Sequence, residues 1–435
     1  MNGCKVSIII PIFNTAEYLR KCLDSCIYQT LSDIEIVAVV DGHDNHPEME
    51  MLSKYEMTYP DKIRTIFLSE RKGPGNARNE ALRIAKGEYV IFVDGDDFID
   101  FELCEKVFNA LTDSSADIAV FDYYYMRDGI LGLRQSNDFS AITNNDDIPF
   151  YINKIRCWFL MIKTALIVNN DLYFTGFYGE DIVTSLWYAE SKKTIKINKP
   201  FYYYVYRADS PTSEMKDQKI WGFIKNYVDI LKHPFCKSRS DDFVNALSFF
   251  IINYLCGYWL ATLIRNKQNC LYDFCKILYD TARVYGFRSS ENKLWESERI
   301  KKILYFYNDN KESVDFNEKF VVFYTQLDFI IIKERLIQLK HKLANKNIVL
   351  WAAGHYGEII AKAMSQIGII FEITNIDAKN NKNDAFVSWN LLRQNADVVL
   401  VTGSEFVKGV KLIVDNDAAV YDLQKYLNGS NVING

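Results

Sequence analysis

The sequence lacks the cysteine and histidine spacings of a zinc site. It has nine cysteines, but they form no Cys-x-x-Cys pair and no Cys/His set at ligand spacing. Their odd number and their scatter along a long chain favour a reducing cytoplasm over a disulfide framework. An excess of basic residues is also missing, because the formal net charge is −5. A general nucleic-acid binder needs a basic surface to displace counterions, so we expect no nucleic acid partner.

Long apolar runs are scarce as well. The first one, residues 6–13, is short and has the character of a strand, so no export signal is visible. Residues 243–264 carry no charge over roughly the length of a membrane span. That segment contains Asn245, Ser248 and Asn253, which favours a buried or interfacial helix, with a true span as the alternative. Internal repeats and low-complexity segments are absent.

What the first hundred residues do contain is an alternation of apolar strands and amphipathic helices. Strands are predicted over residues 5–10, 34–40, 63–68 and 89–93. This rhythm indicates a mostly parallel sheet covered by helices on both faces. Ligands of such sheets gather beyond the carboxyl ends of the strands. The polar and turn-forming residues lie at those ends and predict one crevice: Asn14, Asp41, residues 73–75 and residues 94–97.

The remainder of the chain divides into two further regions. Helical spacing and aromatic residues dominate residues 216–345, and a second α/β pattern follows. We therefore predict an α/β domain over 1–215, a helical region over 216–345 and a Rossmann-like α/β domain over 346–435. In the last of these, residues 351–357 form an incomplete Gly-x-Gly-x-x-Gly frame, and Asp377 lies about twenty residues on. Nucleotide binding and a structural or partner-docking role are the two alternatives for this domain.

Three acidic residues crowd the end of the fourth predicted strand, in the sequence Asp94-Gly95-Asp96-Asp97. Carboxylates placed this close repel one another unless a cation or protons compensate. Mg²⁺ and Mn²⁺ prefer oxygen ligands and bridge well to a diphosphate, where they neutralise charge on a leaving group. The alternative is a solvated turn or the cap of the next helix. The position beside the other crevice residues favours the metal site.

Two more features of the crevice point to a nucleotide. Asp41 ends the second strand and offers a carboxylate to the imide N–H of uracil, although Asp-Gly is also a common turn. Arg71, Lys72 and Arg78 flank the Gly-Pro-Gly turn, where a cation would offset the charge of a diphosphate. We favour Arg78 because it falls in the first turn of the helix that leaves the loop. A surface charge is the alternative for each of the three.

Together these residues resemble the inverting glycosyltransferases of family 2, which have the GT-A fold. The resemblance covers about residues 5–213, and its motifs match in order and spacing over residues 6–14, 39–42, 75–79 and 85–97. It implies a GT-A domain that moves a sugar from a nucleoside diphosphate, most commonly UDP, to an acceptor hydroxyl with the help of Mn²⁺ or Mg²⁺. Family habit also implies a role in making a surface polysaccharide or glycan.

The resemblance carries the family's roles to particular positions. It implies that Pro11, Phe13 and Asp41 hold the base, and that Asp94 and Asp96 form the Asp-x-Asp pair, with Asp96 nearest the metal. The implied nucleotide site also includes Asn14, Gly95, Arg78 and, on the diphosphate, Arg207 in the segment that often closes the site. Residues 177–181 resemble the family's Glu-Asp element.

In that element the resemblance implies that Asp181 is the catalytic base and Glu180 its neighbour. The alternative is a helix N-terminus, where acidic residues are favoured in any case. Both descriptions can hold for the same two residues, because the start of a helix is a good place to fix a base.

One departure from the family pattern bears on the donor. The family commonly has a second acid before Asp41 and a serine after the glycine, where this chain has Val40 and His43. The implied acceptor is a carbohydrate or lipid-linked glycan, and the implied location is the cytoplasm, peripheral to the inner face of the cell membrane. The competing hypothesis is a non-catalytic nucleotide-sugar or carbohydrate-binding protein. A nucleotidyltransferase is disfavoured because residues 11–15 contain no glycine.

Overall fold

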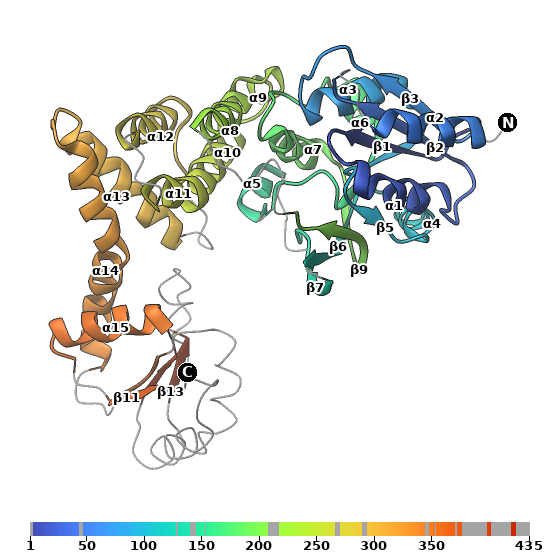
Figure 1. Ribbon diagram of the computed structural model, residues 1–435. Helices are drawn as coiled ribbons and strands as arrows, with labels where there is room; N and C mark the ends of the chain where they lie inside the picture. Colours follow the sequence, from blue (N-terminus) through green and yellow to red (C-terminus); the bar gives the residue numbers. More distant parts are fainter. Residues whose placement is uncertain are drawn as a thin grey trace. The chain divides into compact units, whose positions relative to one another are not determined.

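The computed structural model describes residues 3–42, 47–127, 129–139, 145–152, 154–207, 217–265, 270–288, 294–343, 348–352, 354–369, 372–375, 398–401 and 419–422. The chain divides into two compact units, residues 1–251 and 252–435. The first unit contains a large sheet with its helices, and the second contains helices and a small sheet (Figure 1). The predicted domain boundaries near residues 215 and 345 stay a prediction.

Four parallel strands form the part of the large sheet that the sequence predicted. They are β1 (Val6–Ile12), β2 (Ile34–Val40), β3 (Ile63–Phe67) and β4 (Tyr89–Phe92), in the order β3-β2-β1-β4. β1, β2 and β4 are buried along their whole length, as expected for β-branched and apolar runs covered on both faces. Ile12 pairs with Val40 in the register, so the carboxyl ends of β1 and β2 are level.

Helices connect these strands, because parallel neighbours need a crossover connection between them. They are α1 (Ala16–Ile27), α2 (Glu48–Thr58) and α3 (Pro74–Ile84). α3 packs against β1 and β2. It begins at Pro74, because proline is well suited to the first position of a helix.

The other half of the sheet is mixed. It consists of β5 (Phe98–Ile99), β6 (Ile118–Arg127), β7 (Ile130–Arg134), β8 (Leu160–Lys163) and β9 (Thr194–Val205). β8 runs antiparallel to β4 and β6, whereas β9 runs parallel to β6. β7 follows β6 after two residues, which is too short for a crossover, so these two strands are antiparallel. The predicted parallel pairing is therefore complete over β1–β4, whereas the other half of the sheet combines one parallel pair with antiparallel ones.

Tyrosine-rich runs pack the mixed half of the sheet. Tyr124 and Tyr203 face each other across β6 and β9 with ring centroids 5.2 Å apart. Trp158 stacks on Tyr202 at 4.6 Å. Such cross-strand aromatic pairs stabilise a sheet. The high aromatic content thus serves the core in this part of the chain.

Further helices complete the first unit. They are α4 (Leu103–Ser114), α5 (Ile148–Tyr151), α6 (Thr164–Asn169), α7 (Thr184–Glu190), α8 (Asp217–Asp229), α9 (Pro234–Lys237) and most of α10 (Asp241–Tyr254). α8 packs against the 3₁₀ turn Glu180–Val183, which leads into α7. A helix from the predicted helical region thus contacts the Glu-Asp element of the sheet domain.

The second unit begins with helices and ends with a small parallel sheet. The helices are α11 (Leu260–Arg265), α12 (Leu271–Tyr285), α13 (Leu294–Asn310) and α14 (Phe316–Leu343). The sheet has the order β11-β10-β12-β13, with α15 (Gly354–Gln366) after β10. Its strands are β10 (Ile348–Ala352), β11 (Glu372–Asn375), β12 (Val398–Val401) and β13 (Ala419–Asp422).

This arrangement confirms the predicted helical region and the α/β pattern after it. The predicted ribose-binding residue, Asp377, lies outside the described residues. Nucleotide binding by this sheet stays a prediction.

The apolar segment 243–264 belongs to a helical run over Asp241–Ile264. Among the described residues this run is the one helix long and apolar enough to cross a membrane, and 69% of its apolar stretch is buried within the structure. A π-helical turn, Leu255–Trp259, interrupts it. The burial favours the predicted buried helix over a span.

Candidate functional site

The predicted site residues of the first strands meet at the carboxyl edge of the sheet. Asp41 follows β2, and its backbone N–H donates to the carbonyl of Ile12 at 2.9 Å. Gly95, in the turn after β4, lies against the end of β1. A Cβ atom on Gly95 would stand 2.9 Å from Thr15 Oγ1 and 3.3 Å from the carbonyl oxygen of Pro11. Only glycine therefore permits this close approach between the two strand ends.

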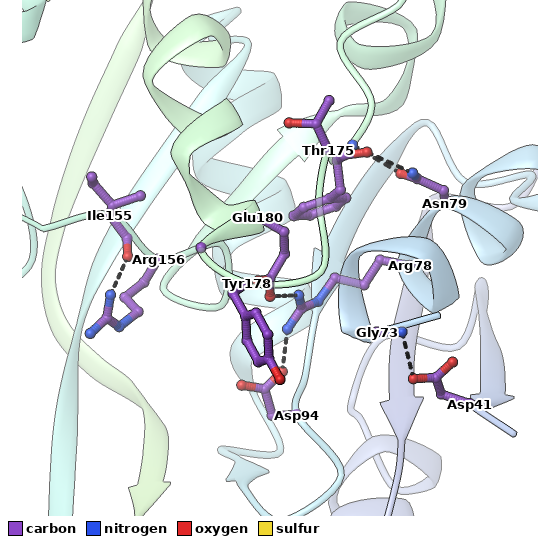
Figure 2. Close-up of polar contacts among 12 residues, drawn as sticks. Asp41, Gly73, Arg78, Asn79, Asp94, Ile155, Arg156, Thr175, Tyr178 and Glu180 are labelled. Atoms are coloured by element: carbon purple, nitrogen blue, oxygen red, sulfur yellow. Dashed lines mark hydrogen bonds and ion pairs between the residues drawn. The ribbon is translucent and has the colours of Figure 1, made fainter. Parts of the chain in front are cut away.

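Asp41 holds the loop that leads into α3. Its side chain is 2% exposed, and its two oxygens accept hydrogen bonds from the backbone N–H groups of Lys72 (2.7 Å) and Gly73 (2.8 Å). Figure 2 shows this carboxylate facing Gly73. Gly73 has φ +90°, a conformation that favours glycine. Each carboxylate oxygen has a second lone pair, so these bonds leave capacity for a base, and that contact stays a prediction.

Arg71 lies beside the aromatic ring that was predicted to hold the base. Its guanidinium is 3.7 Å from the ring centroid of Phe13 and 5.5 Å from that of Phe177. From the sequence we favoured Arg78 among the three cations of this loop and predicted no particular role for Arg71. A guanidinium stacked on rings from two distant segments leaves no local pattern in the sequence, so this contact could not be found there.

Arg78 connects two predicted parts of the site. Its side chain is 3% exposed and donates to Glu180 Oε1 and to Asp94 Oδ1, both at 2.7 Å (Figure 2). A buried cation needs such partners, because an unpaired buried charge costs several kcal/mol. Arg78 therefore joins the acidic turn after β4 to the Glu-Asp element. Its predicted contact with a diphosphate stays a prediction.

The three acidic side chains after β4 each have a partner of their own, and the charges of Asp94 and Asp96 still reach Asp97. Asp94 pairs with Arg78, and Asp96 Oδ2 lies 3.0 Å from Nε of Arg207. Asp97 is 2% exposed and accepts from the hydroxyl of Tyr202 at 2.8 Å. Charge compensation at Asp94 and Asp96 thus comes from two different arginines, and Asp97 is held by a tyrosine hydroxyl.

No group of three or more His, Cys, Asp or Glu residues that could hold a metal ion occurs in the described part of the chain. Asp97 also accepts from the backbone N–H of Val205 at 2.7 Å. Burial, followed by the charges of Asp96 and Asp94, raises the pKa of Asp97 well above its ordinary value. Asp97 therefore supports the turn, and the metal role of Asp94 and Asp96 stays a prediction.

Arg207 reaches the same edge from the end of β9. Besides its ion pair with Asp96, its Nη1 donates to the carbonyl oxygen of Asn14 at 3.0 Å. The ring centroid of Tyr18 lies 5.3 Å from the guanidinium. The structure thus brings together Arg207 and Asn14, which the family pattern had placed at the nucleotide, and Asp96, which it had placed at the metal. Ser210 and Thr212, in the loop predicted to close the site, lie outside the described residues.

The Glu-Asp element lies at the start of a helix, as predicted. Glu180 and Asp181 open the 3₁₀ turn that leads into α7, after Gly179 with φ +69°. Burial, then the charge of Asp181, raises the pKa of Glu180 to about 7, while Arg78 acts in the opposite direction. Among the residues that the structure describes, buried Asp181 Oδ1 has no hydrogen-bond partner of ordinary geometry, and the carboxylate lies close to the buried Cys157 thiol.

The two acids of this element thus differ in their surroundings. Glu180 accepts a hydrogen bond from Arg78, whereas Asp181 retains an oxygen with unused acceptor capacity. A Cβ atom on Gly75 would stand 2.9 Å from Cβ of Glu180, so the glycine lets α3 approach the element closely. The predicted role of Asp181 as the base stays a prediction.

Comparison with known proteins finds one family over the same part of the chain. Residues 7–172 match the family model "Glycosyl transferase family 2". The chain is 32% identical over 222 residues to glycosyltransferase GlyA of Streptococcus pneumoniae serotype 4, which covers 47% of this chain and 31% of GlyA. This chain therefore spans about a third of the length of that relative.

A second relative is matched over most of its length. The poly(ribitol-phosphate) beta-N-acetylglucosaminyltransferase TarP of Staphylococcus aureus is 27% identical over 292 residues, covering 63% of this chain and 84% of TarP. Among solved structures, S. aureus TarS 1–349 in complex with UDP-GlcNAc has a TM-score of 0.55 at 18% identity, covering 71% of this chain and 91% of TarS 1–349. At that identity the likeness shows the fold alone.

Proposed function

Since residues 7–172 belong to glycosyltransferase family 2 and the chain has the GT-A fold, we propose that the protein transfers a sugar from a UDP-linked donor to a hydroxyl group of a glycan acceptor. The observation that carries this proposal is the pair of bonds made by Arg78. They tie Asp94, at the strand end where donors of this fold bind, to Glu180, beside the proposed base. Donor and base groups are thereby held within one rigid cluster.

The donor assignment rests on the site and on the relatives. Phe13, whose ring also contacts the Arg71 guanidinium, and Asp41 are the proposed partners of a uracil base. Arg207 offers a cation for the diphosphate. TarS binds UDP-GlcNAc in its crystal structure, and TarP is named as an N-acetylglucosaminyltransferase. UDP-GlcNAc is therefore the first donor to test. The substitutions at Val40 and His43 make a screen of other nucleotide sugars necessary.

The proposed reaction is a single displacement with inversion. Asp181 removes the proton of the acceptor hydroxyl, and the resulting oxygen attacks the anomeric carbon on the face opposite to UDP. The carbon develops oxocarbenium character as the bond to the diphosphate breaks, as in glycoside hydrolysis. Arg207 stabilises the charge that builds on the departing diphosphate. Glu180 already accepts from Arg78, which leaves Asp181 as the base.

A divalent ion fits this site through Asp94 and Asp96. Both side chains are partly exposed, at 26% and 22%, whereas Asp97 is buried and bonded at both oxygens. Mg²⁺ often retains one or two protein carboxylates and fills its other positions with phosphate oxygens and water. Bound Mn²⁺ or Mg²⁺ would supply charge neutralisation on the leaving diphosphate. Arg78 and Arg207 compensate the same two carboxylates in the free chain.

The acceptor class follows from the relatives. TarP is named for poly(ribitol-phosphate), so we propose a surface glycan or polyol-phosphate chain, free or lipid-linked, as the acceptor. We further propose that the protein works in the cytoplasm at the inner face of the membrane, where such chains are assembled.

The decisive variant is Asp181→Asn. We expect sugar transfer to fall by about a thousandfold, because the amide cannot take up the acceptor's proton. The affinity for UDP with Mn²⁺, measured by isothermal titration, should change little. Product formation is measured with each nucleotide sugar in turn. The control is Asp171→Asn. Asp171 is an exposed acid shortly before Asp181 in the sequence, and its positive φ of 54° suits asparagine.

Two outcomes would contradict the proposal. Undiminished transfer by Asp181→Asn would remove Asp181 from the role of base. Tight binding of a nucleotide sugar without turnover of any donor by the unaltered protein would support the competing hypothesis of a non-catalytic binding protein.

A further inference from the structure

The loop that carries the proposed base is fixed at its beginning by a buried amide. We call residues 174–181 the acidic loop. Asn79, on α3, donates from Nδ2 to the carbonyl oxygen of Phe174 at 2.9 Å and accepts at Oδ1 from the N–H of Phe174 at 3.0 Å. One side chain thus satisfies both backbone groups of the first residue of the loop.

A second buried amide, Asn226 on α8, fixes the rest of the acidic loop. Its Nδ2 donates to the carbonyl oxygens of Thr175 (2.6 Å), Gly179 (3.0 Å) and Tyr178 (3.2 Å). Its Oδ1 accepts from the hydroxyl of Thr175 at 3.0 Å. The side chain is 7% exposed. The amide has two N–H hydrogens for three carbonyl oxygens, so one hydrogen is shared between two of them. The side chain of Asn226 thus binds three residues of the acidic loop.

The backbone of the acidic loop is shaped to fit α8. Gly176 and Gly179 have φ values of +73° and +69°, which favour glycine. A Cβ atom on Gly176 would stand 2.7 Å from Cγ of Asn226. One on Gly179 would stand 2.6 Å from the rings of Phe223 and Tyr227, also on α8. The turns of the loop and the side chains of the helix therefore depend on each other.

We propose that Asn226 is a positioning residue that sets the orientation of Glu180 and Asp181 for sugar transfer. The proposal rests on the proposed function. The carbonyl of Gly179, which accepts from Asn226, is joined directly to Glu180, and Glu180 accepts from Arg78. α8 lies beyond residue 172, where the family match ends, and beyond residue 215, where we predicted the end of the catalytic domain. The catalytic unit thus includes α8.

The chemistry of the contact requires an amide at this position. Aspartate has nearly the same shape but no donor, so it would place a negative charge against three carbonyl oxygens and near the two acids of the loop. Alanine would leave the carbonyl groups of a buried turn without their donor. Neither change touches a group that contacts the donor or the metal.

The test uses the full-length protein with Asn226→Asp, Asn226→Ala and a control, Asn245→Ala. Asn245 lies on α10 and donates within its own helix to the carbonyl of Asp241. The release of UDP from UDP-GlcNAc with Mn²⁺ gives kcat and KM, and titration with UDP gives the affinity. We expect kcat to fall about tenfold or more in both Asn226 variants, with donor KM and UDP affinity within twofold, since misplacing a reacting group by 1 Å costs up to about a hundredfold.

The pH profile separates positioning from a general loss of structure. The added charge of Asn226→Asp raises the pKa values of nearby carboxyl groups, so the acidic limb of kcat should move to higher pH. Asn226→Ala should lower kcat without that movement. Hydrogen exchange in residues 174–181 should quicken in both variants and stay unchanged in Asn245→Ala.

Several results would overturn the proposal. One is an unchanged kcat in folded Asn226→Asp. Another is a loss of kcat matched by an equal loss of UDP affinity. If Asn226→Asp does not fold, Thr175→Val is the deciding variant, because it removes only the hydroxyl that donates to Asn226. We expect its kcat to fall two- to fivefold. An unchanged kcat in Thr175→Val refutes the positioning role of Asn226. Absence of UDP release from the unaltered protein with any nucleotide sugar would instead refute the proposed function itself.

Discussion

At the scale of single residues, the site is a buried balance of charge. Arg78 contributes one positive charge between Asp94 and Glu180, and Asp181 follows directly in the chain. Burial and the charge of Asp181 raise the pKa of Glu180 to about 7. A carboxyl group with that pKa exchanges its proton near neutral pH. The net charge beside the proposed base therefore changes in the range where the protein would work.

The protonation of Glu180 has a consequence for stability. Its pKa in the folded chain, about 7, lies above the ordinary value of 4.5 expected in the unfolded chain. Between these two values the folded state keeps a proton that the unfolded state has lost. The free energy of unfolding should therefore fall as pH rises through this window, by up to about 1.4 kcal/mol per pH unit from this group.

Glu180→Gln tests this prediction. Glutamine does not titrate but keeps an oxygen to accept from Arg78. The thermal midpoint of the variant, relative to that of the unaltered protein, should rise as pH increases from 4.5 to 7 and then stay level. Thermal unfolding in matched buffers across this range measures it. A difference that is the same at every pH would contradict the raised pKa of Glu180.

At the scale of elements, the turn after β4 shows why side-chain directions were not predictable. The sequence places three acids within four residues, and repulsion between them suggested one shared cation. The partners of Asp96 and Asp97, however, are Arg207, just after β9, and Tyr202, on β9, about a hundred residues later. No local sequence pattern predicts that β9 will lie beside this turn. The position of the turn at the crevice followed from strand periodicity, whereas its ion pairs depend on tertiary structure.

Asp96→Ala tests the role of this turn in metal binding. If Asp96 holds the ion, its loss should weaken UDP binding in the presence of Mn²⁺ by at least about tenfold and leave the UDP affinity measured without metal unchanged. Isothermal titration with and without Mn²⁺ separates metal-dependent UDP binding from UDP binding that needs no metal. Asp113→Ala, at an exposed position near the end of α4, is the matched control. Equal weakening in both titrations would argue against a metal role for Asp96.

At the scale of the whole molecule, the site is assembled from more of the chain than its motifs suggest. The strands β1–β4 and their polar ends followed from β-branched runs, because a buried parallel strand has a clear composition. The mixed half of the sheet did not, since β8 and β9 join it through long-range pairing. Asn226 was missed because it is one asparagine on a helix, without a motif around it. Its role appears only once α8 lies against the acidic loop.

This wider assembly predicts how the chain tolerates shortening. All residues assigned to the site lie between Pro11 and Asn226, within the first compact unit. A protein ending at residue 343 keeps α8 and should bind UDP with unchanged affinity and release it from the donor at a similar rate. A protein ending at residue 215 loses Asn226, so the acidic loop loses four hydrogen bonds and, with them, the placement of Asp181. We expect that shorter protein to show little or no UDP release. Donor turnover by the soluble fraction of each protein measures the difference, and equal turnover by both would show that α8 is dispensable.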